Sequence, residues 1–205
     1  MSKVLVINAH PQNPNSRTLK ILHVFLKEYQ NMHPNDQVDE LDLYEDNFPE
    51  IDSDLLSAWG LLRSGQPAEN LNGDQKEKLQ KFNDATNQFL AADKIVIANP
   101  MWNLNIPTKL KAWIDAINVA GKTFKYTVDG PIPLTHGKKA LHIQAAGGKY
   151  ENKDFGTQYV KAILNFVGVE SVQKISVEGM DNFPEEAAEI VHHAEIETQQ
   201  IADAF

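Results

Sequence analysis

Three polar or aromatic stretches of the sequence carry residue types that could hold a ligand, and each follows a short apolar run. The first is AHPQNPNSRTLK at residues 9–20, the second is NPMWNLNIP at 99–107, and the third is QAAGGKY at 144–150. Short apolar runs followed by such stretches are typical of buried strands and the loops at their ends. The chemistry open to each stretch depends on its side chains and on the backbone shapes that its glycines and prolines allow.

The first stretch predicts an anion site. Asn15 or Ser16 is a natural N-cap for a following helix, whose N-terminus presents free N–H groups and a positive dipole end. Ser16 and Thr18 add hydroxyl donors, Arg17 adds a positive charge, and His10 could reach the same spot. An ordinary capped helix explains these residues equally well. The stretch has neither the glycine pattern of a dinucleotide-binding turn nor the lysine of a P-loop.

The second stretch places large side chains beside two prolines. Met101 and Trp102 could cap the hydrophobic core, which is the simpler explanation. A large aromatic residue on a backbone pinned by Pro100 and Pro107 would also form a wall for a planar ligand. We expect Pro107 to occupy the first position of the next helix.

The third stretch contains the paired glycines Gly147 and Gly148, which let the backbone approach a ligand and turn its N–H groups inward. A simple glycine turn is the plainer explanation of this pair taken alone. Together the three stretches suggest an anion clamp, an aromatic wall and a glycine edge. A planar ring with a phosphate tail fits all three, and flavin mononucleotide (FMN) is the obvious candidate.

The composition excludes several other classes of site. The chain of 205 residues has 28 acidic and 19 basic residues, a net charge of −9, which argues against a partner that is nucleic acid or an anionic membrane surface. It has no cysteine, so disulfides and thiolate chemistry are excluded. No apolar run approaches the roughly 20 residues that a membrane span needs, and the N-terminal apolar run is too short for a signal peptide. We therefore expect a cytoplasmic protein.

The histidines do not suggest a metal site. His142 lies within an apolar run and is expected to be a packed core residue. His192 and His193 lie on the last predicted helix and are expected at the surface. No third ligand is near them in the sequence, so we predict no bound metal.

The pattern of apolar residues predicts the elements that position the three stretches. Strands are expected at residues 3–9, 37–43, 93–99, 138–146 and 171–177, with amphipathic helices between them. This alternation predicts an α/β fold, a doubly wound, five-stranded parallel sheet with helices on both faces. Five strands suit the flavodoxin-like order 2-1-3-4-5, in which ligands bind beyond the carboxyl ends of the strands, where the three stretches lie.

The chain is predicted to be a single domain spanning residues 1–205, with two excursions from the minimal fold. Residues 44–73 form a long insertion with a helix expected around Ser53–Leu62. Its apolar side chains would suit a contact with a second subunit, or packing on their own chain. Residues 119–137 are expected to be irregular, with a turn at residues 129–131. Long structured loops of this kind are often functional.

The chain resembles the FMN-dependent NADH:azo-compound and quinone oxidoreductases, which have a flavodoxin-like fold. The resemblance runs nearly end to end and is most specific at PMWNLNIPTKLKAWID (100–115), which is similar to the family's flavin loop. It continues through TFKYTVDGP (123–131), AAGGKY (145–150), NFVGV (165–169) and EGM (178–180).

The resemblance implies roles for individual residues, all of them contacts to the flavin. The phosphate clamp maps to Ser16, Arg17 and Thr18 with His10 nearby, and Tyr126 resembles an aromatic residue near the flavin face. The ring contacts map to Pro100, Met101, Trp102, Asn103 and Leu104, and the pyrimidine edge to Ala145, Ala146, Gly147 and Gly148. Two features depart from many azoreductases, which have serine at the position of His10 and Ser-Arg in place of Ala145-Ala146.

The resemblance also implies an activity. NADH or NADPH would pass a hydride to flavin N5 in a ping-pong cycle, and a quinone, azo or nitroaromatic compound would then accept the electrons. No side chain is required as acid or base. Family members are homodimers whose active sites use both chains. Two alternatives remain at this point: a flavodoxin-type electron carrier without a substrate of its own, and a regulatory flavodoxin-like domain, whose clustered strand-end aspartates this chain lacks.

Overall fold

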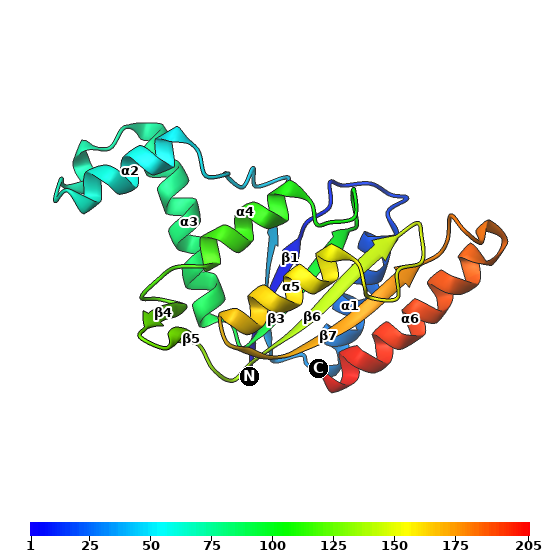
Figure 1. The fold of residues 1–205 in the computed structure, drawn as a ribbon. Helices are drawn as coiled ribbons and strands as arrows, with labels where there is room; N and C mark the ends of the chain where they lie inside the picture. The colour runs from blue at the N-terminus through cyan, green and yellow to red at the C-terminus, as the bar shows by residue number, and fades with distance from the viewer.

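The computed structural model describes all residues 1–205 and consists of a parallel sheet between two layers of helices (Figure 1). The strand order is β2-β1-β3-β6-β7, and every neighbouring pair is parallel. Counted within this sheet alone, the order is 2-1-3-4-5, so the predicted flavodoxin-like fold class is confirmed. The strands are β1 (Lys3–Asn8), β2 (Gln37–Asp42), β3 (Lys94–Pro100), β6 (Lys138–Ala146) and β7 (Val169–Glu178).

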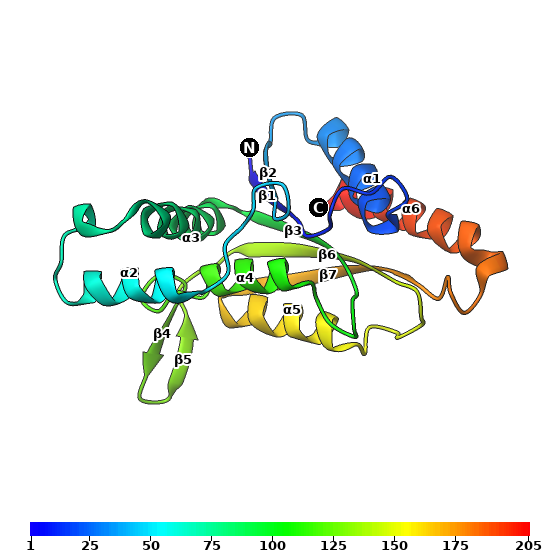
Figure 2. The same cartoon turned by 90° about the horizontal axis from the view of Figure 1, so that it is seen from above.

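Helices cover both faces of the sheet (Figure 2). Alternate residues of the central strands supply the two cores. In β3, Ile95 and Ile97 join the core under one helical layer, while Val96 and Ala98 join the core under the other. Burial on both faces explains why the central strands β1 and β3 are largely apolar, whereas the edge strands β2 and β7 carry exposed polar residues. One layer contains α1 (Arg17–Met32) and α6 (Ala187–Ala204), and the other contains α3 (Gly73–Ala91), α4 (Thr108–Ile117) and α5 (Phe155–Phe166).

The first excursion carries α2 (Ser53–Arg63) and a 3-10 helix (Ala68–Asn70). The predicted helix is therefore confirmed, and it projects from the body of the molecule (Figure 1). It packs on α3, where the rings of Trp59 and Phe82 lie 5.8 Å apart. Leu55 is buried, whereas Leu56 remains 57% exposed. The apolar residues of this segment thus divide between packing on their own chain and facing outward.

The second excursion is a β-hairpin, so the prediction of an irregular segment was wrong. It consists of β4 (Phe124–Thr127) and β5 (Gly130–Pro133), which pair antiparallel. The turn is closed by the Thr127 hydroxyl, which donates to the Gly130 carbonyl at 2.7 Å, and Gly130 adopts a φ of 115° that favours glycine. Two prolines in a strand of four residues hide the usual strand pattern. The hairpin packs on α5 through Phe124 and Phe166, whose rings lie 4.7 Å apart.

One helix start differs from its predicted position. Pro107 is the N-cap of α4 rather than its first helical residue, because its ψ of 149° is extended. The last helix is preceded by a 3-10 turn (Pro184–Glu186), and its α-helical part begins at Ala187. No helix in the structure is both long enough and apolar enough to cross a membrane.

Candidate functional site

The three predicted ligand stretches meet at one cavity, at the carboxyl ends of β1, β3 and β6. Its volume is about 260 Å³. The sheet order makes β1, β3 and β6 neighbours, so the loops that follow them are brought side by side. The lining residues are His10, Asn13, Asn15, Ser16, Arg17, Thr18, Pro100, Met101, Trp102, Ala145, Ala146, Gly147 and Met180.

The N-terminus of α1 forms one wall of this cavity. Ser16 is the N-cap, because its Oγ accepts a hydrogen bond from the Leu19 N–H at 3.2 Å. Of the two candidate N-caps, Asn15 and Ser16, the structure therefore selects Ser16. The Arg17 and Thr18 amides come next, and neither donates to an acceptor within the protein. Arg17 forms no ion pair and is exposed. Two free amides, a hydroxyl at Thr18 and an unpaired guanidinium suit an anion such as a phosphate.

Asn13 shapes the loop before that helix. Its side-chain oxygen accepts from the Asn15 N–H at 2.9 Å, and its carbonyl accepts from the Ser16 N–H at 3.0 Å. Asn13 and Asn15 line the cavity, although Asn13 was not predicted at all and Asn15 was predicted only as a possible N-cap. An asparagine that folds back on the chain two residues later is a recognisable turn signal, which would have marked Asn13.

The second wall is a tight turn after β3. Trp102 and Asn105 exchange two backbone hydrogen bonds of 2.9 and 3.0 Å. The two residues between them, Asn103 and Leu104, have φ angles of 49° and 64°, as in a type I′ turn. Upstream, the Met101 N–H donates to the Ala145 carbonyl at 2.8 Å and fixes the turn to β6.

Trp102 stands out from this turn rather than filling the core. The indole is 42% exposed. Its ring lies 5.9 Å from the ring of His10 and 6.4 Å from that of Tyr44. The explanation of Trp102 as a cap of the hydrophobic core is therefore wrong, and the residue lines the cavity instead.

The third wall is the backbone after β6. A Cβ on Gly147 would lie only 1.9 Å from Oδ2 of Asp181, and the Asp181 N–H donates to the Gly147 carbonyl at 2.9 Å. Gly147 is therefore required by the close approach of the segment after β7. That segment also brings Met180 into the cavity. Ala145 and Ala146 have no polar side chains, so only main-chain groups could bind a polar ring edge here.

Four of the predicted residues do not line the cavity. Asn103 and Leu104 form the tip of their turn, and Gly148 lies beside the Tyr150 ring. Tyr126 lies on the β-hairpin and is 74% exposed.

The hairpin and the cavity lie toward opposite ends of α5. The hairpin packs on Phe166 at the C-terminal end of this helix, whereas Gly156 at its N-terminal end lies so near the turn that a Cβ there would be 3.3 Å from the carbonyl carbon of Asn105. Twelve helical residues rise about 17 Å, so Tyr126 does not reach the cavity of its own chain.

A buried polar layer lies beneath the loops. Oδ1 of Asn99 accepts from Nε2 of His142 at 2.7 Å, and the Asn99 amide donates to the Pro100 carbonyl at 2.8 Å. Both side chains are buried. Burial holds the pKa of His142 well below its usual value, so the imidazole is neutral and its Nε2–H is a donor. This agrees with the prediction of a packed histidine.

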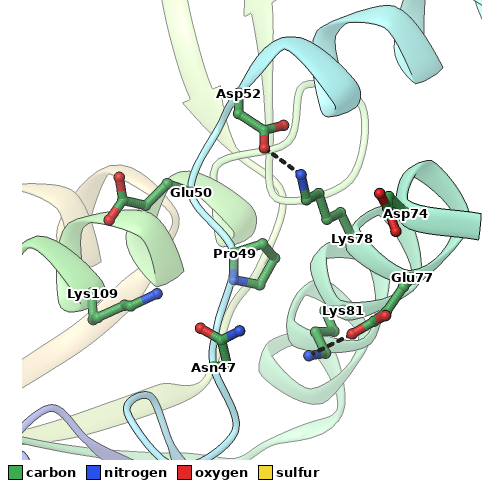
Figure 3. A pocket seen from close by; sticks show the side chains of 9 residues that line it. All are labelled: Asn47, Pro49, Glu50, Asp52, Asp74, Glu77, Lys78, Lys81 and Lys109. Atoms are coloured by element: carbon green, nitrogen blue, oxygen red, sulfur yellow. Dashed lines mark hydrogen bonds and ion pairs between the residues drawn. The ribbon is translucent and has the colours of Figure 1, made fainter.

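A second cavity, of about 450 Å³, lies between the segment before α2 and the helix α3 (Figure 3). None of its nine lining residues is hydrophobic. Its lysines already have partners within the chain: Lys78 pairs with Asp52, Lys81 with Glu77, and Lys109 donates to the Phe48 carbonyl. It offers no apolar wall for a planar ring. The lining residues are Asn47, Pro49, Glu50, Asp52, Asp74, Glu77, Lys78, Lys81 and Lys109.

Comparisons with known proteins agree with this geometry. A model of proteins with a flavodoxin-like fold matches residues 2–201. The chain is 44% identical to the FMN-dependent NADH:quinone oxidoreductase of Geobacillus kaustophilus and 41% identical to that of Streptococcus suis, with full coverage of both chains in each case.

Solved structures give the same result. The FMN-dependent NADH-azoreductase of Bacillus anthracis, determined in complex with FMN, has a TM-score of 0.92 and 34% identity, covering 100% of this chain and 99% of that one. A second azoreductase structure, from Bacillus anthracis strain Sterne, has a TM-score of 0.89 and 34% identity over the whole of both chains. The chain therefore belongs to the family of flavodoxin-like proteins that includes the FMN-dependent NADH:quinone oxidoreductases and NADH-azoreductases.

Proposed function

We propose that this chain is an oxidoreductase that binds FMN in the cavity at the carboxyl ends of β1, β3 and β6. NADH or NADPH is the electron donor, and quinones, azo compounds and nitroaromatic compounds are the acceptors. The observation that carries the proposal is the meeting of an anion site, an exposed indole and a glycine edge in one cavity. Full-length relatives named as FMN-dependent NADH:quinone oxidoreductases support it.

The residues present fit the parts of FMN. The free amides of Arg17 and Thr18, with the Arg17 guanidinium, suit the phosphate. The exposed faces of Trp102 and Met101 suit a flat apolar ring. Main-chain groups from Ala145 to Gly147 suit the polar edge of that ring, where N–H donors would stabilise negative charge by the logic of an oxyanion hole.

When bound, FMN supplies the redox chemistry by taking a hydride from the nicotinamide and passing electrons to the acceptor. The chain's own residues bind and orient it. No side chain of the cavity is placed as an obligatory acid or base: Nδ1 of His10 lies 2.6 Å from its neighbouring Pro11 carbonyl, and His142 is buried and neutral. The proposal includes a ping-pong cycle, in which donor and acceptor use the same surface beside Trp102 in turn.

The proposal includes a homodimer whose active sites use both chains. Tyr126 and Val128 on the hairpin are exposed apolar side chains of the kind found in subunit contacts. Leu104 and Phe155 are also exposed, near the cavity. Because Tyr126 does not reach its own cavity, a role at the flavin face requires the hairpin of a second copy. Sedimentation at micromolar concentration tests this, and a monomer at that concentration would contradict it.

The visible spectrum of the purified protein tests cofactor binding, since bound flavin gives characteristic absorption bands. Steady-state assays with NADH or NADPH and a quinone test the activity. FMN-loaded protein that never oxidises a nicotinamide would instead be a flavodoxin-type electron carrier. Parallel initial-rate patterns against the two substrates would support the ping-pong cycle, and intersecting patterns would contradict it.

A further inference from the structure

A buried cluster of charges lies behind the cavity, in the layer between the sheet and α5. Lys174 lies within β7, Glu178 ends that strand, and Asp154 is the N-cap of α5. Three of their polar atoms are buried and have no hydrogen-bond partner: Nζ of Lys174, Oδ2 of Asp154 and Oε1 of Glu178. Buried charged groups without partners are strongly unfavourable, so three in one place point to a shared partner.

Lys174 lies close enough to both carboxylates for their charges to act on it. Burial lowers the pKa of Lys174 to about 7, while the negative charges of Asp154 and Glu178 oppose that shift. Lys174 does not donate directly to either carboxylate. One water molecule would give each of the three atoms a hydrogen-bond partner, because it accepts one hydrogen bond from Nζ and donates one to each carboxylate oxygen.

We propose that Lys174, through one buried water shared with Asp154 and Glu178, positions the segment 147–154 and so the backbone at Gly147 that faces the cofactor. This inference rests on the proposed function, because it assigns FMN to the cavity. Lys174 is a positioning residue, since it acts through the two carboxylates and does not line the cavity.

The second oxygen of Glu178 binds the middle of that segment, and that of Asp154 ties the end of the segment to α5. Oε2 of Glu178 accepts from the N–H groups of Tyr150 and Glu151 at 2.7 and 2.8 Å. Glu151 and Asn152 have φ angles of 54° and 61°, a strained conformation for residues with side chains. At the other end, Oδ1 of Asp154 accepts from the Thr157 N–H at 2.8 Å.

The same cluster extends to the turn that carries Trp102. Nε2 of Gln144 donates to Oδ1 of Asp154 at 3.1 Å, and Oε1 of Gln144 accepts from the Asn99 amide at 3.3 Å. That amide also donates to the Pro100 carbonyl. A continuous series of buried hydrogen bonds thus joins Asp154 to both of the loops that would face the flavin ring, and not to the phosphate site on α1.

This separation gives the test. Removing the charge in Lys174→Met leaves two buried carboxylates unbalanced and releases the segment at Gly147. FMN and riboflavin share the ring, but only FMN has the phosphate. We expect Lys174→Met to weaken the binding of FMN and of riboflavin by the same factor, about tenfold or more. Arg17→Ala, in contrast, should weaken the binding of FMN alone. Titrations by flavin fluorescence quenching measure both dissociation constants, and Lys161→Met, at an exposed lysine of α5 outside that segment, is the matched control.

A double variant distinguishes loss of this electrostatic arrangement from general misfolding of Lys174→Met. Lys174→Met with Glu178→Gln removes the imbalance while keeping an oxygen acceptor for Tyr150 and Glu151, so it should recover part of the affinity lost in Lys174→Met. The wild-type affinity should also fall as the pH rises through about 7, where Lys174 loses its charge, and this titration should vanish in Lys174→Met. The other titratable groups that face Lys174 are Asp154, Glu178 and the neutral His142.

Two results would overturn the inference. One is flavin affinity unchanged in folded Lys174→Met. The other is a high-resolution crystal structure of the wild-type protein in which Lys174 contacts a carboxylate directly with no water between them. If the wild-type protein binds neither FMN nor riboflavin, the proposed function fails instead, which is a different outcome.

Discussion

The imidazole of His10 and the indole of Trp102 lie with ring centroids 5.9 Å apart and planes inclined by 60°, across the carboxyl ends of two adjacent strands. The ring of Tyr44, two residues after the end of β2, lies 6.4 Å from the indole. Three loops thus hold Trp102 at the rim of the cavity while 42% of its surface stays exposed. The orientation of this side chain is set by neighbours distant in sequence.

The first prediction concerns Trp102 itself. Trp102→Ala removes the aromatic wall and should weaken FMN binding by about 1 kcal/mol, roughly fivefold, with Trp102→Phe recovering part of the loss. Fluorescence titration with FMN measures the change. Trp59→Phe, on α2 and away from the cavity, should leave the dissociation constant unchanged. Equal affinity in Trp102→Ala and wild type would mean that the indole does not contact the ligand.

Arg17 carries the second prediction. Its exposed guanidinium has no partner in the protein, so Arg17→Ala should weaken FMN about tenfold through loss of a charged contact to phosphate. The wild-type affinity should fall with rising salt, and that dependence should be smaller in the variant. Lys20→Ala serves as the control, because Nζ of Lys20 already pairs with Glu195 at 2.8 Å. A salt dependence identical in Arg17→Ala and wild type would argue against this contact.

Leu104 gives a prediction about stability. It holds a φ of 64° at the second central position of a type I′ turn, where a residue with a side chain is strained by roughly 1 kcal/mol. Its side chain is 47% exposed, so little packing would be lost. Leu104→Gly should therefore raise the melting temperature by a few degrees, and Leu104→Val should lower it. Thermal unfolding followed by circular dichroism decides; a lower melting temperature for Leu104→Gly would contradict the assigned strain.

A fourth prediction concerns acid stability at the opposite end of the sheet. Hydrogen bonds from the Ser2 N–H at 2.6 Å and the Tyr29 hydroxyl at 2.7 Å, with Lys94 nearby, hold the pKa of Asp36 well below its usual value. A carboxyl group with a lowered folded-state pKa stabilises the protein above its unfolded pKa. That contribution is lost as the pH falls below about 4.

Asp36→Asn should accordingly be less stable at neutral pH, by about 1–2 kcal/mol, and should lose less stability on acidification. Urea unfolding at a series of pH values measures both effects. Asp39→Asn, at an exposed carboxylate on β2, should behave like the wild type. A parallel pH dependence in Asp36→Asn and wild type would show that this carboxylate is not responsible.

Much of the fold was predictable because its signals are local. Strands buried on both faces require continuous Val, Leu and Ile, as in KVLVIN, and helices require an apolar stripe, so the order of elements and the parallel sheet follow from the sequence. The hairpin of the second excursion was not predicted, because Pro131 and Pro133 are unusual residues in a strand.

The candidate site was also predictable in part. The sequence determined which stretches follow the strands, and therefore that the residues around Ser16, Trp102 and Gly147 face one edge of the sheet. The resemblance to a known family narrowed a planar ligand with an anionic tail to FMN.

Only the tertiary structure decided which of these groups meet. It turned Trp102 out toward His10, placed Tyr126 at the far end of α5 from the cavity, and brought the carboxylates of Asp154 and Glu178 near Lys174. These relationships depend on the register between strands and on helix packing, which join residues far apart in the chain. Local periodicity carries no information about such pairs, because it fixes the face on which a side chain lies but not the neighbour that it meets there.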